Sequence, residues 1–158
     1  MLFRSGDPVT PEPVQIAYRQ QLSGETFTLL GYPITTVIAE KLSTAVALGG
    51  LNTRDRDYAD LYRLLTLHEL DGNALSAALA ATATHRGIEL QQLGPLLLGF
   101  ADRRQASYTA WRKRQGSASA GYPEQYSVVV ETVTTFADPL LAEAVTGRSW
   151  HPIRRTWA

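Results

Sequence analysis

The feature that most constrains the fold is a change in hydrophobic periodicity at Tyr32-Pro33. Before it, apolar and polar residues alternate in two runs, residues 14–18 and 27–29, separated by Ser23-Gly24-Glu25. Alternation with a period of two is typical of strands, and Ser-Gly favours a turn between them. After it, apolar residues recur every three to four positions, as on one face of a helix. The sequence therefore predicts an α+β fold that is mainly α, with short N-terminal strands followed by a helical C-terminal region.

Capping signals divide the helical part into six expected helices and an extended tail. Proline suits a helix start, glycine suits a helix end, and Asn, Asp or Thr can cap a first turn. The tail carries Trp150 and Trp157, which are expected to pack back on the helices. The expected helices span residues 33–49, 53–70 (capped by Asn52 or Thr53), 73–87, 102–115, 123–137 and 139–147.

Composition excludes several classes of protein. The chain has 158 residues and no cysteine, which excludes disulfide scaffolds, cysteine zinc sites and thiol nucleophiles. Its three histidines show no metal-ligand spacing. No uninterrupted run reaches the ~18 apolar residues of a membrane span, and the N-terminus has no signal-peptide pattern. We therefore expect a cytoplasmic protein without a membrane partner.

The net charge of zero conceals an uneven distribution. Residues 1–100 carry seven cations and ten acids, a net charge of −3, whereas residues 101–158 carry eight cations and five acids, a net charge of +3. Thirteen of the fifteen cations are arginines, and the two lysines are Lys41 and Lys113. A neutral chain argues against a strongly basic nucleic-acid coat protein, but its basic second half is compatible with an RNA contact.

Lys41 is the first candidate functional residue. It lies on the edge of the apolar stripe of the first expected helix, four residues after Val37 and four before Ala45. A lysine at such a position either extends its charge past the core to water, with its stem covering apolar surface, or holds the charge at a site.

A second candidate group lies at the start of the next helix, where five charges fall within seven residues, 54–60. Arg54, Asp57 and Leu61 share one helix face, and Asp57 and Asp60 lie one turn apart. Acids in a first turn also complement the helix dipole, so a solvated helix start explains the pattern equally well. The functional alternative is phosphate binding by arginines beside free helix N–H groups, with the aspartates orienting a cation or a water molecule.

A third group is basic and interleaved with Tyr108, Trp111 and Trp157. Basic residues beside aromatic rings suit RNA phosphates and unstacked bases, although solvated helix faces have similar compositions. The candidate RNA-binding residues are Arg103, Arg104, Arg112, Lys113 and Arg114, with Arg148, Arg154 and Arg155 as further basic residues.

Two of these motifs together resemble a known family. They are Tyr32-Pro33-Ile34-Thr35-Thr36-Val37-Ile38-Ala39-Glu40-Lys41-Leu42 and, with sixteen residues from Lys41 to Asp57, Arg54-x-Arg56-Asp57-Tyr58-x-Asp60-Leu61. This pair resembles the AbiEii/AbiGii toxin family of nucleotidyltransferases, the MenT-like toxins of type IV toxin–antitoxin (abortive infection) systems. The opening Gly6-Asp7-Pro8-Val9 and the segment from Phe136 onward are similar to the family's two ends.

The resemblance implies a polymerase-β-like nucleotidyltransferase fold with a helical C-terminal region. It implies Mg²⁺-dependent transfer of a nucleotide from an NTP to an RNA acceptor, the 3′ end of tRNA in the MenT-type members. Lys41 then matches the lysine that holds the NTP phosphates, and Asp57 the aspartate that orients Lys41 or a catalytic water. Arg54, Arg56 and Asp60 match substrate-binding positions. A cognate antitoxin is a further implied partner.

The chain also departs from the family pattern. A Gly-Ser motif and a pair of metal-binding carboxylates are expected upstream of Gly6-Asp7, and the position of a third carboxylate falls at Leu2. We therefore expect residues 1–50 to be the C-terminal remnant of the nucleotidyltransferase core and residues 51–158 to be a helical domain, with the metal ligands unassigned. The alternative is a truncated, non-catalytic remnant that binds nucleotide, tRNA or antitoxin without chemistry. A purely structural helical module is a third interpretation.

Overall fold

The computed structural model describes residues 17–20, 25–28 and 33–158. Strands β1 (Ala17–Gln20) and β2 (Glu25–Thr28) pair antiparallel, with Tyr18 opposite Phe27. The two expected N-terminal strands are therefore confirmed where they are described, while the start of the first run, the Ser-Gly turn and Leu29 lie outside the described residues.

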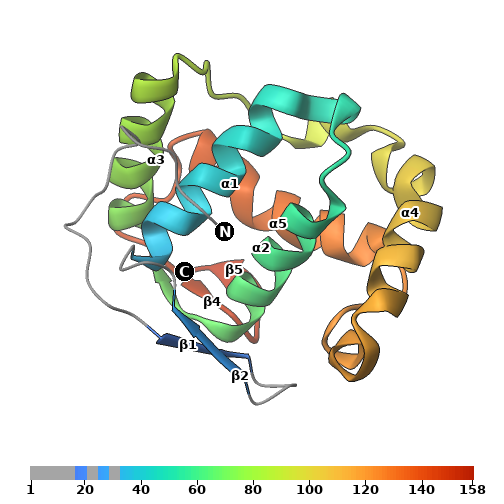
Figure 1. The fold of residues 1–158 in the computed structure, drawn as a ribbon. Coiled ribbons are helices and arrows are strands. Elements are labelled where there is room, and N and C mark those ends of the chain that lie inside the picture. The colour runs from blue at the N-terminus through green and yellow to red at the C-terminus, as the bar shows by residue number, and fades with distance from the viewer. Residues whose placement is uncertain (1–16, 21–24, 29–32) are drawn as a thin grey trace.

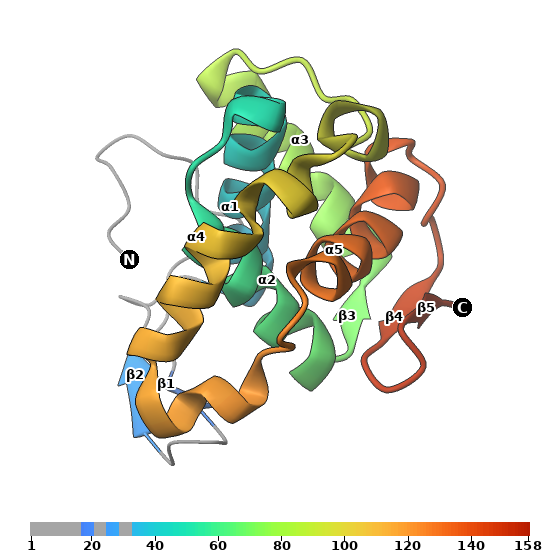
Figure 2. The ribbon, with the colours of Figure 1, turned by 90° about the vertical axis from the view of Figure 1, so that its right-hand side faces the viewer.

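Residues 33–158 are mainly helical, which confirms the mainly-α α+β class (Figure 1). The helix α1 packs chiefly against α3, while α2 and α4 both pack against α5. In Figure 1, α3 and α4 lie on opposite sides of the molecule, and Figure 2 shows α4 crossing in front of α1 and α2. The α-helices are α1 (Ile34–Leu48), α2 (Asp55–Leu67), α3 (Gly72–Arg86), α4 (Phe100–Arg114) and α5 (Tyr126–Leu141); the 3-10 turns are η1 (Gly49–Leu51), η2 (Gly94–Leu97) and η3 (Gly116–Gly121).

One continuous apolar core joins all five helices. Ile38 and Leu42 of α1 are fully buried in the same cluster as Leu61 of α2 and Phe136 of α5. The predicted division between residues 1–50 and 51–158 therefore does not coincide with a break in the described core, and it stays a prediction. Burial of this shared apolar surface is the main force that fixes α1 against the other helices.

The segment Ile34–Leu51 is long and apolar enough, by length and composition alone, to cross a membrane. It does not stand out in the sequence as an uninterrupted apolar run, because it contains Glu40 and Lys41 and ends in Gly49-Gly50-Leu51. In this structure 56% of the segment is buried inside the protein, as is typical of the core helix of a folded domain.

Several helix boundaries differ by a few residues from the expectation, and two of these differences have a clear cause. Asn52 is one of the two expected caps of the second helix, but its Oδ1 accepts a hydrogen bond from the Arg54 N–H (2.7 Å), so it forms a turn just before α2 begins at Asp55. The fifth expected helix does not stop before Pro139, because α5 continues through it to Leu141. Pro139 lacks an N–H and so removes one intrahelical hydrogen bond, and α5 ends two residues after it.

No separate helix spans 139–147 in the described part of the chain. After Leu141 the backbone turns, and Glu143 adopts a positive φ of 58°. Asp138, one residue before the proline, anchors this end of α5 because its carboxylate accepts hydrogen bonds from the N–H groups of Leu93 (2.6 Å) and Gly94 (3.1 Å).

The C-terminal tail forms a small antiparallel sheet in the order β3 (Leu70–Asp71), β4 (Ser149–His151) and β5 (Thr156–Trp157). The indole N–H of the fully buried Trp150 donates to the Leu65 carbonyl (2.8 Å), and its ring packs edge-on against Phe136. Trp157 stacks on the same phenyl ring, with centroids 5.2 Å apart. The expected packing of both tryptophans on the helices is confirmed.

Candidate functional site

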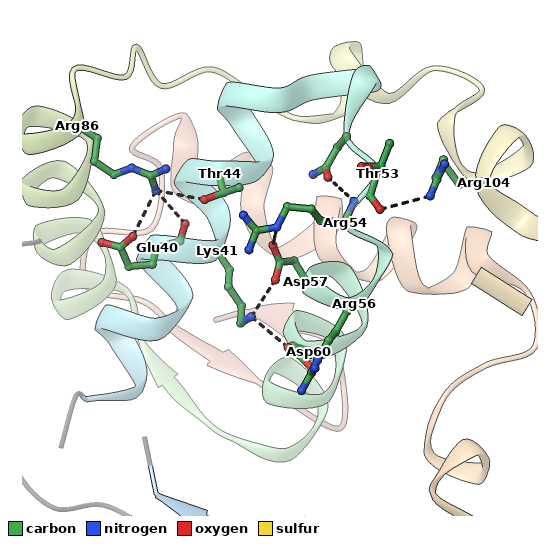
Figure 3. A network of polar contacts seen from close by, with 11 residues as sticks. Glu40, Lys41, Thr44, Thr53, Arg54, Arg56, Asp57, Asp60, Arg86 and Arg104 are labelled. Carbon is green, nitrogen blue, oxygen red and sulfur yellow. Dashed lines mark hydrogen bonds and ion pairs between the residues drawn. The ribbon is translucent and has the colours of Figure 1, made fainter. Parts of the chain in front are cut away.

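Lys41 and Asp57 meet where the middle of α1 crosses the first turn of α2 (Figure 3). The Lys41 ammonium is 3.1 Å from Asp57 Oδ1, and the two side chains are only 4% and 10% exposed. One interpretation of its sequence position was that Lys41 extends its ammonium to solvent. The structure excludes that interpretation, because the side chain is buried. Its charge is held inside the protein beside a buried carboxylate, which is costly unless it is compensated.

Asp60 supplies a second partner for the same ammonium. Its Oδ2 is also 3.1 Å from Lys41 Nζ, and Asp60 faces the same side of α2 as Asp57 because the two lie one turn apart. Lysine suits this position because a compact ammonium can donate to two separate carboxylates, whereas a guanidinium favours a planar, two-pronged contact with one.

Two arginines of the α2 start complete the network at its exposed edge. Arg54 Nε lies 2.7 Å from Asp57 Oδ2, and Arg56 Nε lies 3.8 Å from Asp60 Oδ2. The Arg54 and Arg56 side chains are 53% and 75% exposed, so the network runs from a buried lysine to two solvent-facing guanidinium groups. The structure thus brings together the five candidate site residues that the two motifs contain. Their roles in a reaction stay a prediction.

The network carries more positive than negative charge. Three cations share two carboxylates, which leaves one positive charge in excess. An ammonium has three N–H donors, and only two of those on Lys41 are used by Asp57 and Asp60. The terminal amino groups of Arg54 have no hydrogen-bond partner in the part of the chain that the structure describes. These unused donors suit an anion.

The same five residues do not provide a binding site for a magnesium ion. Mg²⁺ needs oxygen ligands in near-octahedral geometry, but both oxygens of Asp57 and one of Asp60 are already paired with cations. No group of three or more His, Cys, Asp or Glu side chains that could hold a metal ion occurs among the described residues. The expected Mg²⁺ therefore has no ligand set in this part of the chain.

Glu40, the neighbour of Lys41, belongs to a different contact. On the other side of α1, its Oε2 is 3.3 Å from Arg86 Nη1 of α3, and the same nitrogen donates to Thr44 Oγ1 (3.2 Å) (Figure 3). Adjacent helix residues point in different directions, so Glu40 ties α1 to α3 while Lys41 faces α2.

The predicted RNA-binding cations of α4 divide into two groups. Arg104 forms a two-pronged pair with the buried Asp55, at 3.1 Å and 2.9 Å, and that hydrogen bonding raises the pKa of its guanidinium. Arg103 donates to the Leu98 carbonyl and Arg112 to the Tyr122 carbonyl, so both also hold elements together. Lys113 and Arg114 are exposed at the C-terminal end of α4.

The aromatic residues that interleave with these cations also have different environments. Tyr108 is fully buried, and Trp157 packs on Phe136 far along the chain from α4. Trp111 and Trp157 are both partly exposed, and of these two only Trp111 belongs to α4, near its basic end. Contact with RNA at this surface stays a prediction.

A buried lysine between two carboxylates, with arginines at the exposed edge of a helix start, is an arrangement whose excess positive charge can attract an anion such as a phosphate. Residues 3–138 match the family described as nucleotidyl transferase AbiEii toxin, type IV TA system. The match covers most of the chain and includes the whole network, so the chain belongs to this family of nucleotidyltransferase toxins of type IV toxin–antitoxin systems. Neither a curated protein nor a solved structure matches the chain.

Proposed function

We propose that this protein transfers a nucleotide from an NTP to an RNA acceptor, the 3′ end of tRNA, and that the Lys41 network binds the phosphates of the NTP. The observation that carries this proposal is the placement of Lys41 Nζ 3.1 Å from both Asp57 and Asp60, with one positive charge in excess over the five residues. Family membership supports the transfer of a nucleotide and an antitoxin as a partner.

The residues have different parts in this proposal. Lys41 donates its third N–H to a phosphate oxygen, and Asp57 is a positioning residue that fixes the ammonium and Arg54 at once. Arg54 and Arg56, at the exposed edge, bind the outer phosphates and bring charge that a triphosphate requires. In the transfer, the 3′ oxygen of the RNA bonds to the α-phosphorus of the NTP and pyrophosphate leaves. The low dielectric around Lys41 strengthens its attraction to the negative charge that develops on the phosphates in this step.

The family generally uses a divalent metal ion, for which the described residues provide no ligand set. This observation favours a second candidate function, a protein that binds nucleotide, tRNA or antitoxin without chemistry. In that case Lys41 still binds phosphate, but no covalent product forms.

A transfer assay separates the two candidates. The purified protein is incubated with MgCl₂, total tRNA and each α-³²P-labelled NTP in turn, and the tRNA is resolved on a denaturing gel. We expect label on tRNA with at least one NTP and no label with Lys41→Met. The absence of label with every NTP contradicts the enzymatic proposal and supports the binding protein.

Two further variants guard against a folding artefact. Arg54→Gln removes an exposed guanidinium, and we expect it to lower transfer roughly tenfold or more, the worth of a charged hydrogen bond. Ile153→Ala removes an exposed side chain of the β4–β5 turn, outside the network, and is expected to leave transfer unchanged. Equal transfer by Arg54→Gln and Ile153→Ala would rule out a role for Arg54.

A further inference from the structure

A partly buried pair of aromatic rings lies near α2, the helix that carries Asp57 and Asp60. Trp111 comes from α4 and Tyr122 from the segment after η3, and their centroids are 5.0 Å apart in an edge-to-face arrangement. Both rings pack on the edge of the core with part of their surface open, in contrast to the fully buried Tyr58, Tyr108 and Tyr126. The pair therefore offers aromatic surface to solvent in a fixed geometry.

Arg63 connects this pair to α2. It lies three residues after Asp60, its guanidinium carbon is 5.8 Å from the centre of the Tyr122 ring, and its Nη1 donates to the Gly121 carbonyl at 3.5 Å. Burial raises the pKa of the Tyr122 phenol, the Asp60 carboxylate raises it further, and Arg63 and Arg56 lower it. The phenol is therefore within Coulombic reach of the exposed edge of the Lys41 network.

Hydrogen bonds hold the two rings in place. Arg112 Nε donates to the Tyr122 carbonyl (2.8 Å), and the Gln115 amide donates to the Trp111 carbonyl (2.9 Å). The same end of α4 presents Lys113 and Arg114 to solvent. Arg63 of α2 and the exposed Lys113 and Arg114 of α4 thus bring positive charge to the aromatic pair from two helices.

We propose that Trp111 and Tyr122, with Arg63, form a subsite that stacks the unpaired 3′-terminal bases of the RNA acceptor. Aromatic rings and guanidinium planes stack on unpaired bases, while the flanking cations contact phosphates. The inference rests on the proposed function, since the subsite would direct the RNA 3′ end toward the NTP held at Lys41. Single-stranded RNA is also a suitable partner for the basic end of α4, because the negative phosphates complement the positive charge there.

A binding experiment tests this subsite without requiring catalysis. Fluorescence anisotropy is measured with two 5′-labelled RNA hairpins of the same stem, one with four unpaired 3′ nucleotides and one blunt. We expect the wild-type protein to prefer the overhang. Trp111→Leu is expected to weaken overhang binding roughly tenfold, the typical effect of losing one stacked base, and to leave binding of the blunt hairpin within about twofold.

Conservative variants separate stacking from folding. Trp111→Phe keeps a ring and is expected to retain most of the preference, and Tyr122→Leu is expected to behave like Trp111→Leu, with circular dichroism confirming that each variant is folded. Ile153→Ala, at an exposed side chain of the β4–β5 turn, is the control and is expected to bind both hairpins as the wild type does.

Several outcomes overturn the subsite. They are no overhang preference in the wild-type protein, equal weakening of both hairpins by Trp111→Leu, or a loss of ATP binding rather than RNA binding in that variant, which would assign the rings to the NTP base. The proposed function fails separately: an intact overhang preference together with no label transfer leaves the subsite standing and contradicts only the nucleotidyltransferase.

Discussion

At the scale of single residues, the site depends on how the buried charge of Lys41 is compensated. One carboxylate is not enough to fix an ammonium, because it leaves two N–H donors unused. Asp57 and Asp60 fix it from the same face of α2, and Arg54 in turn neutralises the second oxygen of Asp57. Each carboxylate therefore holds two cations in place, and the excess positive charge collects at the exposed edge.

A second buried carboxylate, Asp55, gives the first prediction. Its pair with Arg104 ties the start of α2 to α4, with Asp55 4% and Arg104 24% exposed. Because removing one partner strands a buried charge, Arg104→Met is expected to lower the free energy of unfolding by about 2–3 kcal/mol. Urea denaturation measures this change. In a double-mutant cycle with Asp55→Asn, the coupling energy should show that the two residues stabilise the fold through their contact with each other.

The matched control for this prediction is Arg114→Met on the same helix. Arg114 is exposed, so its substitution is expected to change the free energy of unfolding by less than about 0.5 kcal/mol. Equal destabilisation by both substitutions would show that helix propensity, and not the Asp55 pair, explains the effect.

The sequence allowed the Lys41 network to be predicted but not the Arg104 pair. Lys41, Arg54 and Asp57 belong to two motifs that resemble a family pattern, and it is this resemblance that predicts that they share one site. Arg104 is 49 residues from Asp55 along the chain, and its sequence surroundings are those of a solvated basic helix. Tyr122 and Arg63 could not be predicted for the same reason, because only tertiary packing brings the segment after η3 to α2.

At the scale of elements, the helices were predictable where a cap or a glycine marks the end. The third expected helix illustrates this, since Asp71 Oδ2 accepts a hydrogen bond from the Ala74 N–H (2.8 Å) and Gly87 ends α3 in the left-handed conformation. The failure at Pro139 has a tertiary cause. Asp138 anchors the end of α5 to Leu93 and Gly94, a contact that no local pattern indicates.

The junction of α2, α4 and α5 gives a prediction about pH. Burial raises the pKa values of Tyr58, Tyr108 and Tyr126 far above the usual value of about 10. Above that pH the unfolded chain holds fewer protons than the folded protein, so the free energy of unfolding falls as the pH rises. Absorbance at 295 nm should show these three phenols ionising together with unfolding, as followed by circular dichroism.

Tyr58→Phe provides the control for this titration. The buried Tyr58 hydroxyl has no hydrogen-bond partner among the described residues, so its removal is expected to cost little stability at pH 7 and to remove one late-ionising phenol. Ionisation of all tyrosines near pH 10 in a still-folded protein would contradict the buried junction.

At the scale of the whole molecule, the uneven charge of the sequence is partly resolved by folding. The Asp55–Arg104 ion pair joins the acidic first part to the basic second part and neutralises one charge of each. The exposed cations that remain in the basic part include Lys113 and Arg114 on the end of α4, as well as Arg148 and Arg154, while Arg54 and Arg56 are exposed at the edge of the Lys41 network. The proposed NTP site and the proposed RNA subsite thus each have exposed cations beside them.

The central claim is that Lys41 holds the NTP phosphates, and isothermal titration calorimetry tests it most directly. Each NTP is titrated, in a buffer with MgCl₂, into the wild-type protein and into Lys41→Met and Lys113→Met, each verified as folded by circular dichroism. We predict that at least one NTP binds the wild type, that Lys41→Met weakens its binding tenfold or more, about 1.4 kcal/mol, and that Lys113→Met changes it less than twofold. Wild-type affinity in a folded Lys41→Met protein would contradict the account.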